Sequence, residues 1–248
     1  MIRVLLSLRN VSLSFPRGRR HVLPVLSNVS LDVDTGELVA VLAQRAQGKT
    51  TMLRVAAGMD RPSRGEVLFK GQDLHRLSDR RRSALLRQKI GFAEPIGPDI
   101  DLPVLARVAV PLLATCSKRD AYERALSVLT RLGVEECANQ PWASLADSER
   151  ALAALAQAIV REPELLLVDD LTTTLGIDAT ERIGRLLRSI ALEDGLAVLM
   201  SVSDADATTW FDRVASLSGG ELVQHTQVGP GPENVIDFPS DPARRASS

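Results

Sequence analysis

This 248-residue sequence has few cysteines, almost no net charge and no long apolar run, and each of these features excludes a class of protein. The two cysteines, Cys116 and Cys137, form neither a disulfide framework nor a metal-like spacing, which is typical of a reducing compartment. No apolar segment approaches the ~18–20 residues needed to cross a bilayer, and Arg9 interrupts the apolar start too early for a secretory signal. We therefore expect a soluble, cytoplasmic protein.

Charges of the two signs nearly cancel. Lys and Arg total 30 and Asp and Glu total 31, for a formal net charge of -1. This balance gives no bulk attraction to a polyanion, so we expect no nucleic-acid partner. The length is sufficient for one large α/β domain, or for a core with a smaller subdomain.

The stretch that organises the chain covers residues 39–51 and reads V-A-V-L-A-Q-R-A-Q-G-K-T-T. Its apolar run predicts a buried strand, which breaks at Ala43 into a polar loop and enters a helix through Gly48 and Lys49. Strand, loop and helix in this order indicate a phosphate-binding loop. There the helix N–H groups and the lysine would meet phosphates, and the Thr50 hydroxyl would bind Mg²⁺.

Two alanines break the usual pattern G-x-x-x-x-G-K-[ST]. Ala43 stands where the first Gly belongs, and Ala46 occupies a position that is often Gly. Where the loop needs a positive φ, alanine is strained by about 1–2 kcal/mol per site, and its methyl group obstructs a phosphate. We expect binding to be weakened, not abolished. The candidate phosphate-binding residues are Ala43, Gln44, Arg45, Ala46, Gln47, Gly48, Lys49, Thr50 and Thr51.

Several elements are predicted around this loop. Alternating apolar residues indicate two antiparallel strands within residues 1–35, joined by a basic loop. Residues 78–160 are mainly helical in character, with Ser78 and Ser117 as N-caps, and indicate an inserted helical subdomain. A hairpin is expected over 214–223. The folded domain is expected to span 1–226, followed by a disordered tail over 227–248 that is rich in Gly, Pro, Ser and Arg.

A second motif, L-L-L-V-D-D over residues 165–170, predicts a buried parallel strand that ends in two acids. Ligands of open α/β sheets bind at the carboxyl ends of the strands. Asp169 is therefore expected to hold Mg²⁺ together with Thr50, and Asp170 to face the γ-phosphate. An ordinary Asp-Asp turn is the alternative, which the upstream G-K-T disfavours.

These motifs, with D-R-P-S-R-G-E-V-L-F-K-G-Q-D-L and I-G-F within residues 58–92, resemble the ATP-binding subunit of ABC transporters over nearly the whole chain. The branch that serves lipoprotein release, macrolide export and cell-division permeases is the most similar. The resemblance implies an α/β P-loop NTPase (RecA-like) core with an antiparallel β-subdomain and an inserted α-helical subdomain. It also implies ATP and Mg²⁺ as cofactors, adenine stacking on Phe15, and a transmembrane permease partner at the inner face of the cell membrane.

Several family positions are altered here. The Gln after I-G-F is replaced by Pro95, and the D-loop Asp by Gly176. The catalytic Glu corresponds to Asp170, which is one methylene shorter and should retract a general base from its water. The switch His corresponds to Ser203, which has no imidazole.

The family signature L-S-G-G-[QE] is altered as well. In the family this segment clasps the γ-phosphate held by the opposite subunit, at a helix start. Asp147 would direct a negative charge at that phosphate, and Ala146 lacks a hydroxyl donor. The corresponding residues are Leu145, Ala146, Asp147, Ser148 and Glu149.

Three functions remain open on these residues. The leading interpretation is a degenerate transporter subunit that binds Mg-ATP with slow or absent hydrolysis, as a homodimer or beside an intact subunit. A pseudo-ATPase that binds no nucleotide is the second, and an active ATPase with Asp170 as base is the third. An unrelated phosphate-loop kinase is disfavoured by the β-subdomain and the helical insertion. The transported substrate is selected by the membrane subunit in this family.

Overall fold

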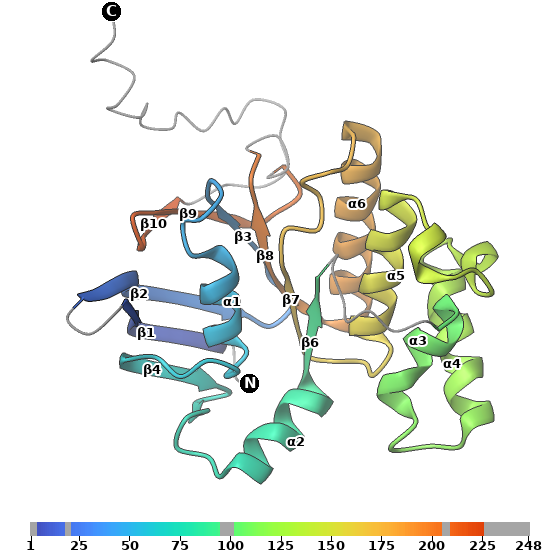
Figure 1. Cartoon of the computed structure of the whole chain (residues 1–248), viewed down its shortest axis with the longest axis horizontal. Coiled ribbons are helices and arrows are strands. Elements are labelled where there is room, and N and C mark those ends of the chain that lie inside the picture. The colour runs from blue at the N-terminus through green and yellow to red at the C-terminus, as the bar shows by residue number, and fades with distance from the viewer. Residues whose placement is uncertain (1–3, 18–20, 95–101, 205–208, 226–248) are drawn as a thin grey trace, which may run out of the picture.

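The computed structural model describes residues 4–17, 21–94, 102–204 and 209–225, and contains two β-sheets (Figure 1). The smaller sheet has four strands in the order β2-β1-β4-β5, and the larger has six in the order β10-β9-β3-β8-β7-β6. The strands are β1 Val4–Arg17, β2 His21–Asp34, β3 Leu38–Leu42, β4 Arg64–Phe69, β5 Gln72–Asp73, β6 Ile90–Ala93, β7 Leu165–Val168, β8 Ala197–Val202, β9 Arg213–Ser218 and β10 Glu221–His225.

The six-stranded sheet is parallel except for β10, which is the antiparallel partner of β9. Side chains of a strand alternate between the two faces. In β7, Leu165 and Leu167 join a core with the smaller sheet and α1 (Lys49–Ala56), whereas Leu166 and Val168 join a core with the helices on the opposite face. Both faces of the sheet are therefore buried, which explains its continuous apolar strands.

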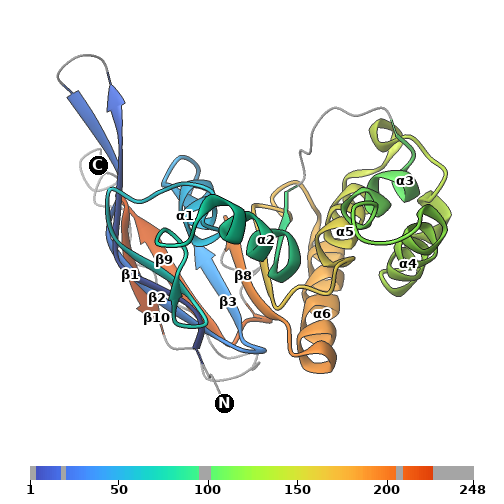
Figure 2. The same cartoon turned by 90° about the horizontal axis from the view of Figure 1, so that it is seen from below.

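The antiparallel subdomain is confirmed. Strands β1 and β2 pair from Val4 with Asp34 to Arg17 with His21, so that they form one long hairpin that projects from the body (Figure 2). Strand β1 also pairs with β4. The apolar residues of this sheet pack on α1 in the same core, and the phosphate loop therefore lies where the two sheets meet.

The remaining α-helices of the described residues are α2 Asp79–Lys89, α3 Val104–Ala109, α4 Lys118–Arg131, α5 Asp147–Ile159 and α6 Ile177–Asp194. Ser78 and Ser117 cap α2 and α4 as expected, each accepting a hydrogen bond from a backbone N–H of the first turn. Helices α3 to α6 form a layer on the face of the large sheet opposite α1 (Figures 1 and 2).

The helical block differs from the prediction in one respect. Strand β6, Ile90–Ala93, lies within the range 78–160 but belongs to the six-stranded sheet, where it pairs with β7. Helix α2 contacts the core that contains α1, and only the segment after β6 forms the separate helical layer. A Cβ at Gly91 would lie 2.5 Å from the carbonyl oxygen of Ala158, so this strand packs closely on α5.

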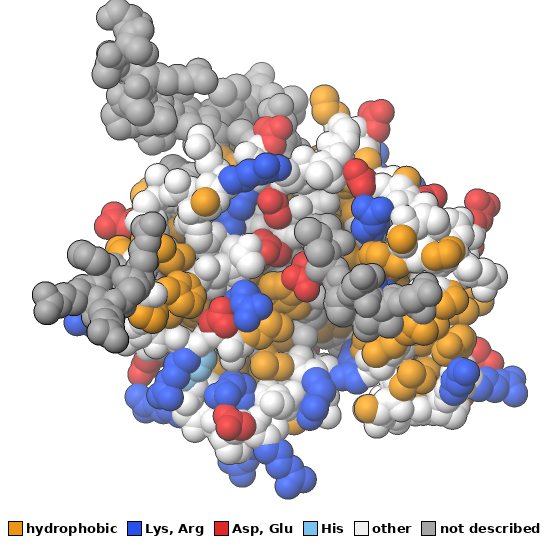
Figure 3. Space-filling model, in the orientation of Figure 1, with side chains coloured by type: hydrophobic (Ala, Val, Ile, Leu, Met, Phe, Trp, Pro, Cys, Tyr) orange, Lys and Arg blue, Asp and Glu red, His pale blue; other side chains and the backbone are white. Residues whose placement is uncertain are grey.

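Basic side chains gather along α2 at the lower edge of the molecule in Figure 3. Among them, Arg80 and Arg81 are exposed to solvent. Within the described residues, no helix is long and apolar enough to cross a membrane. The expected tail, 227–248, lies outside the residues that the structure describes.

Candidate functional site

The phosphate loop connects the carboxyl end of β3 to the start of α1, as the sequence predicts. Gly48 is the N-cap of α1 with φ 95°, and a Cβ there would lie 3.0 Å from the carbonyl oxygen of Val25 in β2. Only glycine combines that φ with that close approach. Among the described residues no side chain caps the helix, so its first N–H groups face the loop, as in an anion-binding helix N-terminus.

The two alanines of the loop have different conformations. Ala46 has φ 63°, in the left-handed region, whereas Ala43 is absent from the positive-φ residues. Ala43 is 5% exposed, and its N–H donates to the carbonyl of Val202 at 3.0 Å. The strain expected at both alanines therefore falls on Ala46 alone. Ala43 behaves as an ordinary core residue at the end of β3.

Lys49 lies at the bottom of the loop and is 6% exposed. Its ammonium donates to the carbonyl of Ala43 at 3.0 Å and to the hydroxyl of Ser203, and it lies 3.5 Å from Oδ1 of Asp170. The Ser203 hydroxyl donates to the same Oδ1 at 3.0 Å. The lysine of the loop, the candidate base and the switch position are thus one connected network.

Asp169 and Asp170 follow β7 and diverge. Asp169 is 7% exposed, and its Oδ1 accepts from the hydroxyl of Ser201 at 2.9 Å. Asp170 has φ 50°, and its N–H donates to the same Ser201 oxygen at 2.9 Å. Ser201, at the end of β8 and fully buried, therefore fixes both acids at the carboxyl edge of the sheet.

The donor set fits a nucleotide phosphate with Mg²⁺. Free helix N–H groups and a buried ammonium suit phosphate oxygens, and Thr50 with Asp169 offers oxygen ligands of the kind that Mg²⁺ prefers. The remaining loop residues lie around them: Gln44 and Arg45 are exposed, Thr51 is half-buried in the first turn of α1, and Gln47 accepts from the N–H of Gly219 at 2.8 Å.

The signature segment forms the start of α5, with Ala146 as N-cap. Glu149 accepts from the N–H of Ala146 at 2.8 Å, and Asp147 accepts from Arg150 at 2.9 Å. Arg150 also donates to the carbonyl of Leu145 at 2.7 Å. The segment satisfies part of its own helix start with carboxylates, which the helix dipole favours. Ser148 is half-buried there.

The other predicted positions are more scattered. Phe15 is 44% exposed on β1, opposite Leu23 of β2, the strand that touches the loop at Gly48. Gly176 is the exposed N-cap of α6. Pro95 lies outside the described residues.

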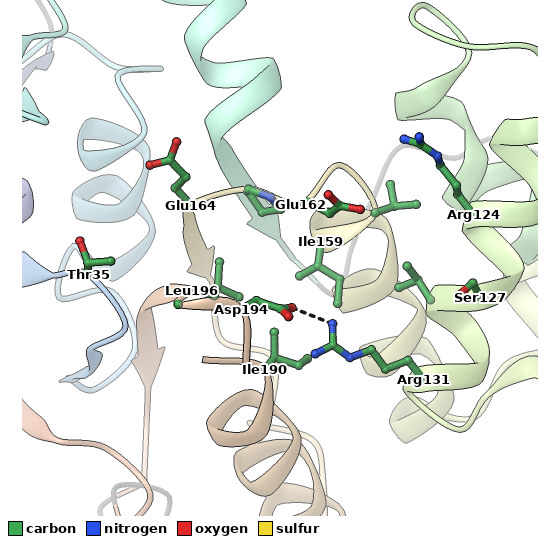
Figure 4. A pocket seen from close by; sticks show the side chains of 14 residues that line it. Thr35, Arg124, Ser127, Arg131, Ile159, Glu162, Glu164, Ile190, Asp194 and Leu196 are labelled. Carbon is green, nitrogen blue, oxygen red and sulfur yellow. Dashed lines mark hydrogen bonds and ion pairs between the residues drawn. The ribbon is translucent and has the colours of Figure 1, made fainter. Parts of the chain in front are cut away.

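Hollows lined by the described residues lie beside the core. One of about 540 Å³ adjoins Ser203 and is lined by Thr173, Ile177 and Trp210 among others. Another, of about 650 Å³, lies at the opposite end of the sheet between α4, α5 and α6 (Figure 4). There Arg131 pairs with Glu193 at 2.8 Å and with Asp194 at 2.7 Å, so much of its rim charge is neutralised within the chain.

Comparison with known proteins identifies the family of this fold and loop. The family described as ABC transporter matches residues 26–173, more than half of the chain. The chain belongs to the ABC transporter family, as an ATP-binding subunit.

Among relatives of this ABC subunit, the lipoprotein-releasing system ATP-binding protein LolD of Hyphomonas neptunium is 32% identical over 209 residues, or 83% of this chain and 91% of the relative. LolD of Pseudomonas syringae pv. tomato is 31% identical over 225 residues, or 90% of this chain and 98% of the relative. The dimeric structure of MJ0796, a bacterial ABC transporter cassette, superposes with a TM-score of 0.82 at 27% identity, and covers 91% of this chain and 100% of that one.

Two site residues were not predicted from the sequence. Ser201 interrupts the apolar run of β8 as its one buried hydroxyl, a signal that was available but ambiguous. Thr173 lies in the run T-T-T after β7 and donates to Oδ1 of Asp170. Nothing in that run distinguishes Thr173 from its neighbours, because its partner is identified only by the fold.

Proposed function

We propose that this ABC subunit binds Mg-ATP and hydrolyses it slowly or not at all, while it serves a transmembrane permease at the inner face of the cell membrane. Lys49 and the helix N–H groups would hold the phosphates, Thr50 and Asp169 would hold Mg²⁺, and Phe15 would stack on adenine. The observation that carries the proposal is the network at Lys49. The network keeps the lysine that would bind phosphate, but in it the candidate base, Asp170, is the counter-ion of that lysine.

Slow hydrolysis follows from the chemistry of three groups. A general base must lie about 3 Å from its water, and Asp170 is a short carboxylate whose Oδ1 already accepts from Ser203 and Thr173. Ser203 has no imidazole to assist it. The signature would present Asp147, an acid 55% exposed, to a phosphate. These features support binding with weak turnover over the active ATPase.

A permease is supported as partner by the family and by an apolar surface. Val110 and Leu113 are 42% and 46% exposed. Pro111, between them in the sequence, lines a hollow of about 370 Å³ together with apolar side chains such as Trp142 and charged ones such as Arg161. The apolar stretch 104–113 is otherwise mostly turned inward, since Val104, Val108 and Leu112 are buried. Co-purification with the membrane partner would identify the second cassette, which is either a copy of this chain or an intact relative.

Equilibrium binding of Mg-ATP to the purified chain tests the proposal, with Lys49→Ala as the matched variant. We expect saturable binding by the wild type and a loss of at least about tenfold in affinity for Lys49→Ala, because a buried ammonium–phosphate contact is removed. Absence of binding by both proteins would instead support the pseudo-ATPase, and attention would move to its surfaces.

A further inference from the structure

The hydroxyl of Thr173 is hydrogen-bonded to the carboxylate of Asp170. Thr173 lies three residues after Asp170 in the turn that leads to α6, and its Oγ1 donates to Asp170 Oδ1. That oxygen also accepts from Ser203 at 3.0 Å and lies 3.5 Å from the ammonium of Lys49. Hydrogen bonds to an ionised oxygen are stronger than those between neutral groups. Two hydroxyls therefore orient this carboxylate toward the lysine.

The ammonium of Lys49 has a partner within the protein for each of its N–H donors. It has three N–H donors. The carbonyl of Ala43, the hydroxyl of Ser203 and the carboxylate of Asp170 surround it, and the side chain is 6% exposed. A phosphate can reach the ammonium only by displacing one of these groups. Asp170 is the competing anion, so its orientation affects how tightly the loop binds phosphate.

We propose that Thr173 is a positioning residue that holds the carboxylate of Asp170 on Lys49 and thereby lowers the affinity of the loop for nucleotide phosphates. The inference rests on the proposed Mg-ATP site and assigns a residue that sets its affinity. Thr173 acts through Asp170: its hydrogen bonds among the described residues go to Asp170 and, at 3.4 Å, to Ser203. Its side chain is exposed, so its substitution leaves the core intact.

Titration calorimetry with Mg-ATP tests this role. Thr173→Val keeps the shape of the side chain and removes the hydroxyl, and we expect binding roughly threefold to tenfold tighter, which corresponds to the net contribution of one typical hydrogen bond. Thr173→Ser, which keeps the hydroxyl, should bind like the wild type. Thr174→Val is the matched control. It alters the next threonine, which is exposed and has no hydrogen-bonding partner for its hydroxyl among the described residues, and should change nothing.

The same substitution in an Asp170→Asn chain separates positioning from a general structural effect. If Thr173 acts through Asp170, Thr173→Val should leave the affinity of Asp170→Asn unchanged. Unchanged or weaker binding in the wild-type background, or an equal gain in both backgrounds, would overturn the inference.

Chemical unfolding of the nucleotide-free chain gives a second test that does not need ATP. The shifts in denaturant midpoint caused by Thr173→Val and Asp170→Asn should be non-additive, because the two side chains share one hydrogen bond. Additive shifts contradict the inference. If the wild type binds no ATP while the shifts remain non-additive, the proposed function fails and the contact itself stands.

Discussion

At the scale of single residues, Ala46 is the alanine of the phosphate loop that adopts a strained, left-handed backbone conformation. Its φ of 63° costs an alanine about 1–2 kcal/mol relative to a right-handed conformation. Glycine there removes the strain but adds freedom to the unfolded chain, worth about 0.4–1 kcal/mol. We expect Ala46→Gly to raise the free energy of unfolding by up to about 1 kcal/mol and to tighten Mg-ATP binding.

Ala43→Gly is the matched control for that change. Ala43 is buried and absent from the positive-φ residues, so glycine at this position only adds freedom to the unfolded chain. We expect it to lower the stability by about 0.5–1 kcal/mol in urea unfolding. Equal effects of the two substitutions would show that the positive φ of Ala46 is not the source of strain.

Asp170 and Ser203 are the residues whose chemistry limits hydrolysis in this account. Asp170→Glu extends the carboxylate by one methylene, and Ser203→His supplies the imidazole that the family has. General-base catalysis contributes about 10²–10⁴-fold, so we expect the double variant to raise single-turnover hydrolysis at least tenfold. Phosphate release measured with excess protein checks this, with Lys49→Ala in the double variant as the blank. No increase would place the defect elsewhere, first of all in the signature.

At the scale of elements, Gly184 of α6 packs directly against Trp210 in the segment before β9. A Cβ at Gly184 would lie 2.1 Å from Cδ2 of Trp210, so the helix has no room for a methyl group there. We expect Gly184→Ala to lower the free energy of unfolding by about 1–3 kcal/mol, the usual effect of overpacking. In a Trp210→Leu chain the same change should cost much less. Thermal unfolding measures both, and equal costs would contradict the packing.

The elements also show how far sequence reasoning reaches. Strands β1 and β2, the loop before α1, the caps Ser78 and Ser117 and the acids after β7 follow from local patterns, because period, capping and turn chemistry are local. Strand β6 does not. Its four residues contain a glycine, and they are identified as a strand only by their pairing with β7, more than 70 positions later.

The site divides in the same way. The motifs of Lys49 and Asp169 fix their positions on elements: Lys49 begins α1, and Asp169 directly follows β7. The hydrogen bonds of Ser201 to the two acids, and of Ser203 to Asp170, join residues more than 30 positions apart. Such contacts depend on strand order. The different conformations of Ala43 and Ala46 likewise require the backbone.

At the scale of the whole molecule, dimerisation tests the altered signature. In the family a nucleotide lies between the loop of one cassette and the signature of the other, and Asp147 would bring a negative charge to that phosphate. We therefore expect the wild type to remain monomeric with Mg-ATP in light scattering. Ala146→Ser combined with Asp147→Gly should shift it toward a dimer. A wild-type dimer that forms only with Mg-ATP would contradict this view of the signature.

The most direct test of binding without efficient turnover is the chemical fate of bound nucleotide. A limiting amount of Mg-ATP is mixed with excess chain, and ATP and ADP are separated after quenching at times from seconds to an hour. We predict that nucleotide is bound and remains mainly ATP for many minutes in the wild type. Conversion to ADP within seconds, abolished by Asp170→Asn, would contradict the account and establish Asp170 as an effective base.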